Sequence, residues 1–259
     1  MTARSTPGRD AAPPPPVAAA GRGGAFGRAL SYEWVALRSL RTPWVLCGSA
    51  VAAQVLVDLA VGRDGTSGLR QFAAGMVGVT LIGFVLLAAF GVNALGGEYR
   101  HRTLTRSVLT LGDRRGILLA KATLTGAVTA SVAAVMVLVN ALSVPVLGKT
   151  SLPVAEAVAP GAAAVLYAVL CALVGLALAG VTRNSTLSIA VVTLWPVLLE
   201  NLLVLTTGFG RNMAPFGAAA AQAQAGDGSG PRWLLMLPLA GLTTVLLTAA
   251  GFLLRRRDV

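Results

Sequence analysis

The sequence has little charge, few aromatic residues and a single histidine. Of its 259 residues, 12% are charged and 5% are aromatic. An ordinary soluble domain carries about 25% charged residues, so the composition argues against a soluble fold. Apolar runs of about 20 residues favour membrane-spanning helices over an outer-membrane barrel, whose strands alternate apolar and polar residues. The sequence therefore predicts an all-α, polytopic membrane protein.

The shortage of cysteine and histidine limits the chemistry that the chain can perform. Cys47 and Cys171 lie inside apolar runs, where they are typical packing residues and not a disulfide or a metal pair. The sequence contains no HExxH motif and no paired intramembrane aspartates, so we expect no metal site, no catalytic residue and no enzyme activity. Residues 143–150 end like a phosphate-binding loop, but they begin with Ser143 and contain Pro145. We therefore expect this chain to bind no cofactor.

Six segments are long and apolar enough to cross about 30 Å of hydrocarbon. They are residues 43–61, 71–95, 117–147, 160–181, 187–207 and 233–254. An even number of crossings places both termini on one side, and 16 of the 21 Lys and Arg residues then share that side. The positive-inside rule makes it the cytoplasmic side of the plasma membrane. The net charge of +11 is explained by this topology, so we expect no nucleic-acid partner.

The domain organisation follows from the same pattern. Residues 1–25 contain Pro13 to Pro16 and lack an apolar stretch, which predicts a disordered cytoplasmic tail. Residues 26–259 form one predicted six-helix transmembrane domain. No connection is long enough for a separate soluble domain, so we expect the function to take place in or against the membrane.

The flank before the first predicted span, residues 26–42, has the pattern of an amphipathic helix. On a helical wheel, Phe26, Leu30, Trp34 and Leu37 share one face. Such a helix lies along the membrane interface, although a plain basic flank that stops transfer is the alternative. Glu33 sits close to the apolar face, which suggests that it has a partner or reaches outward to water.

The stretch between the second and third spans is rich in arginine. If residues 98–111 are helical, Glu98, Arg102 and Arg106 share one face. Gly96 and Gly97 are predicted to break the incoming span, and Gly112 to end the new helix. This pattern predicts a short helix lying flat on the cytoplasmic surface. The alternative is a positively charged loop that holds anionic lipid.

Two segments resemble a known family. The string Glu98-Tyr99-Arg100-His101-Arg102-Thr103, followed by Arg114-Arg115 and Leu119-Ala120-Lys121, resembles the cytoplasmic segment after the second span in permeases of the ABC type-2 exporter family. That segment commonly reads E-[YF]-R-x-G-T, and here Arg102 stands where the family often has glycine. Residues 31–46 are similar to the connecting helix that precedes the first span in that family.

The resemblance implies an exporter built from two permease halves, either two copies of this chain or this chain with a sibling, and two cytoplasmic ATPase subunits. ATP and Mg would be bound by the ATPases, and the cargo would be a hydrophobic or amphipathic drug, antibiotic, lipid or peptide. The connecting helix would carry Phe26, Leu30, Trp34 and Leu37, and membrane lipids would contact the spans. The coupling helix that touches the ATPase would include Glu98, Tyr99, Arg100, His101, Arg102, Thr103 and Arg106. The rival is an ion-coupled carrier, or a membrane immunity or structural protein, that needs no ATPase.

Polar residues inside the predicted spans are candidates for the translocation path, because a carboxylate at mid-membrane costs about 2.5 to 3.5 kcal/mol. We assign Asn140, Glu200 and Asn201 to this path. Glu200 has an alternative role, either reaching outward or capping a partly re-entrant segment at residues 208–225. Asp58 lies near the end of the first span, so we expect it at the interface.

Overall fold

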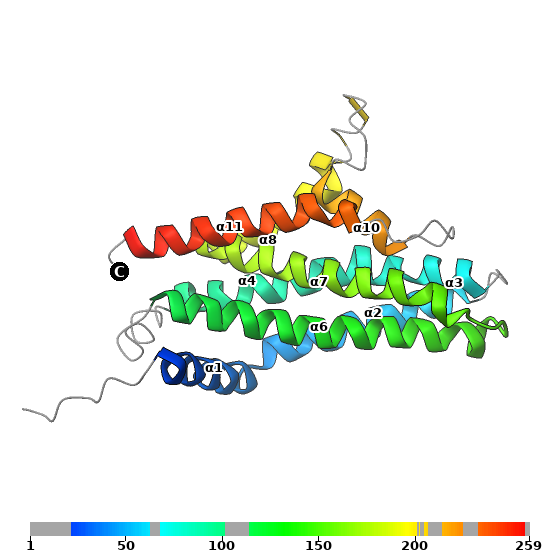
Figure 1. Ribbon diagram of the computed structural model, residues 1–259, viewed down its shortest axis with the longest axis horizontal. Coiled ribbons are helices and arrows are strands. Elements are labelled where there is room, and N and C mark those ends of the chain that lie inside the picture. Colours follow the sequence, from blue (N-terminus) through cyan, green and yellow to red (C-terminus); the bar gives the residue numbers. More distant parts are fainter. Residues whose placement is uncertain are drawn as a thin grey trace, which may run out of the picture.

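The computed structural model describes residues 22–62, 68–101, 114–200, 214–224 and 233–256, together with residues 202, 205 and 206. These residues are almost entirely helical, and no strand occurs among them. The long helices run side by side in one elongated bundle (Figure 1). The predicted all-α class is therefore confirmed.

The first half of the chain contains α1 (Arg22–Ser39), α2 (Arg41–Val61), α3 (Gly68–Gly75), the π-helix η1 (Gly78–Gly83) and α4 (Phe84–His101). The second half contains α6 (Arg114–Leu147), α7 (Val154–Thr182), α8 (Ser185–Leu194), the π-helix η2 (Trp195–Glu200), α10 (Pro215–Gln224), the 3-10 turn η4 (Trp233–Met236) and α11 (Leu237–Arg256). Helix α1 begins at Arg22, inside the segment that the sequence assigned to the tail.

Five helical stretches of the described chain are long and apolar enough to cross a membrane. They are Arg41–Val61, Gly68–Gly97, Gly116–Leu147, Val154–Thr182 and Trp233–Leu253. The remaining predicted span is a shorter apolar helix, Ser185–Glu200, which turns into π-helix at Trp195 and Pro196. Proline has no N–H for the regular helical hydrogen bond, which accounts for the change of helix type at this point. The chain is thus described as a multi-pass membrane protein with five candidate spans, and the sixth stays a prediction.

Two helices occupy the centre of the bundle. Within an apolar window of 18 residues, 67% of the residues in Gly68–Gly97 and 61% of those in Val154–Thr182 are buried, against 22% in each of the other three candidate spans. Glycine allows the backbones of α4 and α7 to approach closely, since a Cβ on Gly91 would collide with the carbonyl oxygen of Ala172, and one on Gly175 with that of Ala88. The outer helices expose apolar side chains, as a surface in contact with lipid requires.

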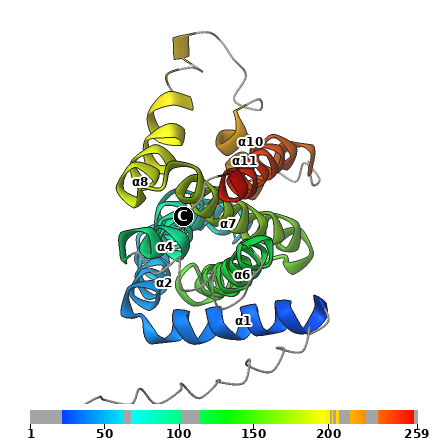
Figure 2. The same cartoon turned by 90° about the vertical axis from the view of Figure 1, so that its left-hand side faces the viewer.

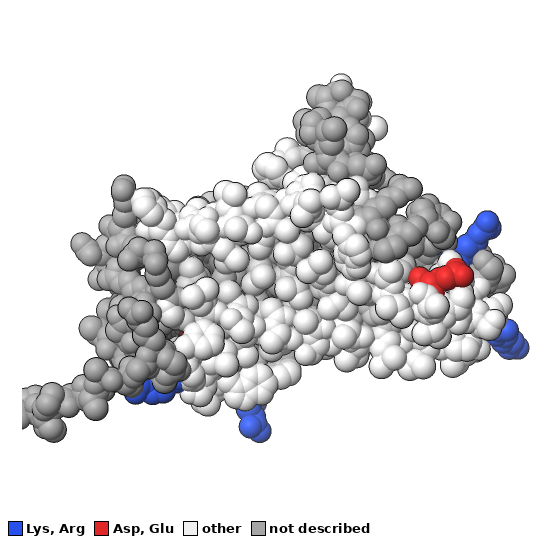
Figure 3. Space-filling view, in the orientation of Figure 1, with Lys and Arg blue, Asp and Glu red and all other residues white. Residues whose placement is uncertain are grey.

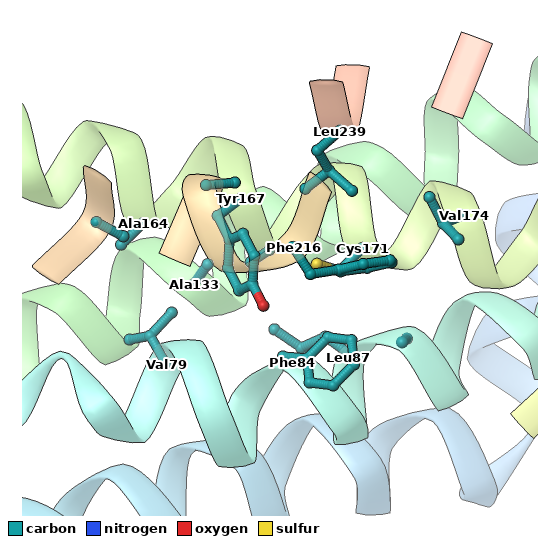
Figure 4. Packing of buried hydrophobic residues seen from close by; sticks show 14 of the residues in the cluster. Val79, Phe84, Leu87, Ala133, Ala164, Tyr167, Cys171, Val174, Phe216 and Leu239 are labelled. Atoms are coloured by element: carbon teal, nitrogen blue, oxygen red, sulfur yellow. The ribbon is translucent and has the colours of Figure 1, made fainter. Parts of the chain in front are cut away.

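An aromatic group fills the middle of the bundle. Tyr167 extends from α7 towards Phe84 of α4, with Phe216 of α10 beside them (Figure 4). The ring centroid of Phe84 lies 6.3 Å from that of Tyr167 and 5.7 Å from that of Phe216. Because α10 contributes a ring to this group, it is part of the core.

On the face shown in Figure 3, the described charged side chains lie at the two ends of the molecule. Coloured Lys, Arg, Asp and Glu side chains occur near α1 and at the opposite end, and the described surface between them is white. Helix α1 runs crosswise to the bundle, beneath α2 and α6 (Figure 2). Its end of the bundle also holds the end of α4, the start of α6 and the end of α11 (Figure 1).

Candidate functional site

Helix α1 is attached to the bundle by a buried ion pair. Nζ of Lys121 in α6 lies 2.6 Å from Oε2 of Glu33, and the two side chains are 3% and 7% exposed. Glu33 and Ala29 are buried among the residues of this helix whose side chains are described, and α1 packs against α6. Such a short contact between buried opposite charges fixes the position of α1 against α6.

The predicted apolar face of α1 is partly exposed. Phe26 and Trp34 are 38% and 43% exposed, whereas Leu30 and Leu37 are half-buried. A crosswise helix with exposed aromatic side chains has the form of an interfacial helix, in which Trp sits at the level of the lipid headgroups. The helix itself is where the sequence predicted it, and its contact with lipid stays a prediction.

The predicted coupling segment is described only at its start. Glu98, Tyr99, Arg100 and His101 form the last turn of α4, and their side chains lie outside the described part. Arg102, Thr103 and Arg106 lie outside the described residues altogether. The predicted break at Gly96 and Gly97 is wrong, because α4 runs through both glycines to His101.

Gly96 has a packing role instead. A Cβ at Gly96 would come within 2.9 Å of the Cβ of Ser185, at the start of α8. That start is fixed by Asn184, whose side-chain oxygen accepts hydrogen bonds from the backbone N–H groups of Thr186 and Leu187, at 3.0 and 3.2 Å. At Gly96, α4 therefore packs closely against the start of α8.

Glu200 caps α10. Its carboxylate accepts hydrogen bonds from the backbone N–H of Phe216 at 3.1 Å and of Gly217 at 2.9 Å. The first N–H groups of a helix lack internal partners and carry a partial positive charge, so a carboxylate there is stabilised. These contacts correspond to the capping role considered for Glu200, and its place on a translocation path stays a prediction. Asn201 lies outside the described residues.

The other end of α10 is anchored to the π-helix η1. Nε2 of Gln224 donates to Oγ1 of Thr80 at 2.5 Å, and the hydroxyl of Tyr167 donates to the carbonyl of Thr80 at 3.3 Å. Thr80 therefore joins η1 to both α7 and α10. Helix α10 is held at both ends by polar contacts that cross the bundle.

A second polar group, termed here the Asp58 cluster, consists of Gln54, Asp58 and Asn140. These residues are 0%, 3% and 1% exposed, so Asp58 is buried inside the protein, and its expected depth at the membrane interface stays a prediction. Nε2 of Gln54 donates to Oδ1 of Asp58 at 2.7 Å and to the carbonyl of Gly75 at 3.0 Å. Nδ2 of Asn140 donates to the carbonyl of Phe72 at 2.9 Å. The cluster joins α2, α3 and α6 around the end of α3.

The structure does not bring Asn140 and Glu200 together, because the described contacts of Asn140 are with α3 and those of Glu200 with α10. Sequence reasoning missed Gln54 as the partner of Asp58, although their separation of four residues on a helix was a usable signal. In the described part of the chain, no group of three or more His, Cys, Asp or Glu residues is placed to hold a metal ion.

Comparison of the whole chain with protein-family models and with curated proteins returns no match.

Proposed function

We propose that this chain is the transmembrane subunit of an ABC exporter of the type-2 kind. It would work with two copies of a cytoplasmic ATPase and with a second permease subunit, either the same chain or a sibling. The cargo would be a hydrophobic or amphipathic molecule moved outward across the plasma membrane. The proposal rests on the resemblance at residues 31–46 and 98–121 and on the arrangement of five candidate spans.

The observation that carries the proposal is the attachment of α1. This helix lies crosswise at the end of the bundle where α4 ends, and the Glu33–Lys121 ion pair joins it to α6. A subunit driven from outside needs a rigid surface at one end that transmits a push to its spans. Helix α4 provides a second rigid element there, because it continues unbroken through Gly96 and Gly97.

The proposed mechanism is a rigid-body movement. Closure of the ATPases on binding ATP would displace the segment that begins at Glu98. Helix α4 would pass this displacement to α7, since the two backbones touch at Gly91 and Gly175 and cannot slide apart without losing that packing. The spans would then alternate between inward-facing and outward-facing arrangements.

The test uses the full chain, tagged and expressed with the P-loop ATPase encoded in the adjoining reading frame. We expect the two proteins to copurify from membranes, and we expect Glu98→Ala or Arg100→Ala to lower transport-coupled ATP hydrolysis without reducing membrane insertion. The matched control is Arg70→Ala, an exposed residue of α3 at the opposite end of the bundle, which should leave ATP hydrolysis unchanged. Full transport by the purified chain without any ATPase would refute the proposal.

An ion-coupled carrier is the second candidate, and the Asp58 cluster favours it. A buried carboxylate with no ion-pair partner among the described residues is typical of membrane sites that carry ions. The two candidates differ in their response to ATP depletion at a constant proton gradient, which stops an ABC exporter and leaves an ion-coupled carrier active. Transport that survives this depletion but is lost in Asp58→Asn would favour the carrier.

A further inference from the structure

The Asp58 cluster contains more hydrogen-bond acceptors than the described residues can satisfy. Oε1 of Gln54, Oδ2 of Asp58 and Oδ1 of Asn140 are buried and have no hydrogen-bond partner. Each of these side chains is at most 3% exposed. In proteins, the great majority of buried polar atoms have a hydrogen-bond partner. Three unpaired oxygens in one cluster therefore indicate that a ligand binds there.

The orientation of the two amides is set by their contacts. The nitrogen of Gln54 donates both to Asp58 and to the carbonyl of Gly75, so its oxygen must be the free atom. In Asn140 the nitrogen donates to the carbonyl of Phe72, which leaves the oxygen of Asn140 free in the same way. Turning either amide would place two oxygens against each other. The unpaired oxygens therefore do not result from a wrongly turned amide group.

The side chains of Asn140 and Asp58 meet at a glycine, and the free oxygen of Gln54 lies against the next glycine, Gly78. A Cβ on Gly75 would collide with Oδ1 of Asn140 and would lie 2.9 Å from Oδ1 of Asp58. Glycine at this position thus lets α6 and α2 both bring an oxygen next to the backbone of α3. Helix α3 ends here, just before the π-helix η1, and backbone carbonyls at such interrupted helices are typical ion ligands in transporters.

The described charged groups nearby do not neutralise Asp58. Helices α3, α4 and α6 and the π-helix η1 pack against α2. Arg70 of α3 is exposed, η1 has no charged residue, and Lys121 of α6 is paired with Glu33 near the other end of the bundle. The remaining charged or titratable residues on these elements are Glu98, Tyr99, Arg100 and His101 in the last turn of α4 and Arg114 and Arg115 in the first turn of α6, at the end of the bundle where α1 lies. The one described donor to this buried carboxylate is the neutral amide of Gln54, so its charge still needs a positive partner.

We propose that the Asp58 cluster binds one monovalent cation, either a proton or Na⁺. Carboxylate and amide oxygens are the ligands that hard cations prefer, and a single carboxylate balances a single positive charge. A proton would reside on the carboxylate of Asp58, whereas Na⁺ would be held between the carboxylate of Asp58 and the free oxygen of Asn140, which meet at Gly75. The site depends only on contacts among α2, α3 and α6, so it is independent of whether an ATPase drives the chain.

The experiment measures the thermal unfolding of the purified full chain in detergent. In the first arm, Na⁺ replaces choline at constant ionic strength and constant pH. A Na⁺ site raises the melting temperature by about 4 °C for each tenfold increase in Na⁺ above its dissociation constant. In the second arm, the pH is varied in choline. A proton site makes the melting temperature fall as the pH rises, because the folded form then holds one more proton than the unfolded form.

The variant Asp58→Asn keeps the size of the side chain and removes its charge, so the response should disappear. The matched control is Glu200→Gln, the same chemical change at a carboxylate outside the cluster, and it should retain the response. If Asp58→Asn does not fold, Asn140→Ala provides the test, because it keeps the carboxylate and removes one ligand. We expect it to raise the Na⁺ concentration that gives half of the shift in melting temperature by roughly tenfold.

The two arms distinguish the cations. A shift with Na⁺ that is lost in Asp58→Asn identifies a Na⁺ site, and a pH response alone that is lost in the same variant identifies a proton site. The proposal is overturned if the wild-type chain responds in neither arm. It is equally overturned if the response persists in Asp58→Asn or, where that variant does not fold, is unchanged in Asn140→Ala.

Discussion

The Glu33–Lys121 ion pair allows a sharp test of how α1 is held. Replacing Lys121 with Met keeps a flexible, unbranched side chain in α6 but removes the ammonium group. Oε2 of Glu33, which lies 2.6 Å from that group, then stays buried beside an apolar neighbour. Breaking a buried pair from one side costs about 3 to 5 kcal/mol of unfolding free energy, because the buried carboxylate loses the opposite charge beside it.

The double variant Glu33→Leu with Lys121→Met should behave differently. Since both charges are removed together, neither is left unpaired, and replacing a buried pair with apolar residues of similar size is often nearly neutral. We therefore expect the double variant to recover most of the stability that the single Lys121→Met variant loses. With the single variant Glu33→Leu measured as well, the double variant's loss minus the sum of the two single losses gives the coupling free energy, which we expect to be several kcal/mol.

The measurement is unfolding of the purified chain in mixed micelles with increasing denaturing detergent, followed by tryptophan fluorescence. The matched control is Lys149→Met, the same substitution at an exposed lysine just beyond α6, which should change the unfolding free energy by less than about 0.5 kcal/mol. If Lys121→Met is as stable as this control, or if the double variant loses as much as the sum of the single variants, the ion pair does not hold α1.

Two further predictions concern the interior. Gly91→Ala should cost about 1 to 3 kcal/mol of unfolding free energy in the same assay, because the new Cβ would collide with the carbonyl of Ala172. The control Gly241→Ala in α11, which has open space around it, should be neutral or slightly stabilising. Equal effects of the two substitutions would show that α4 and α7 do not touch at Gly91. Glu200→Ala should cost about 1 kcal/mol and speed hydrogen exchange at the amides of Phe216 and Gly217 while leaving those of α7 unchanged; unchanged exchange at both amides would refute the cap.

Features carried by local pattern were predictable from the sequence. The helical class, five of the spans and the crosswise helix before the first span follow from run length and helical periodicity. The predicted break at Gly96 and Gly97 was wrong, because packing outweighed the local preference of glycine. Helices α4 and α8 meet at Gly96, where only a small residue fits. Glycine marks close contact in this helix and not its end.

The polar contacts were harder to predict because they join distant parts of the chain. Glu33 and Lys121 are 88 residues apart, and Asn140 and Phe72 are 68 residues apart. The sequence indicated that Glu33 needed a partner, since a carboxylate beside an apolar face is costly, but it could not identify Lys121. Asp58 was placed at the interface because its position near a helix end is compatible with water. Its burial depends on α3 folding back over α2, which no local pattern encodes.

Which helices are central was also hidden from hydropathy, for a physical reason. In water, a buried face is apolar and an exposed face is polar, so periodicity reveals the core. In a membrane, lipid accepts the same apolar residues that the core does, and both faces of a span look alike. The signal that remains is size. Helix α7 buries Ala and Gly along its length, including Ala163, Ala168 and Gly175, whereas the outer helices direct Leu and Val outward. The small residues of α7 therefore mark the interface that positions the aromatic group, α10 and the cap at Glu200.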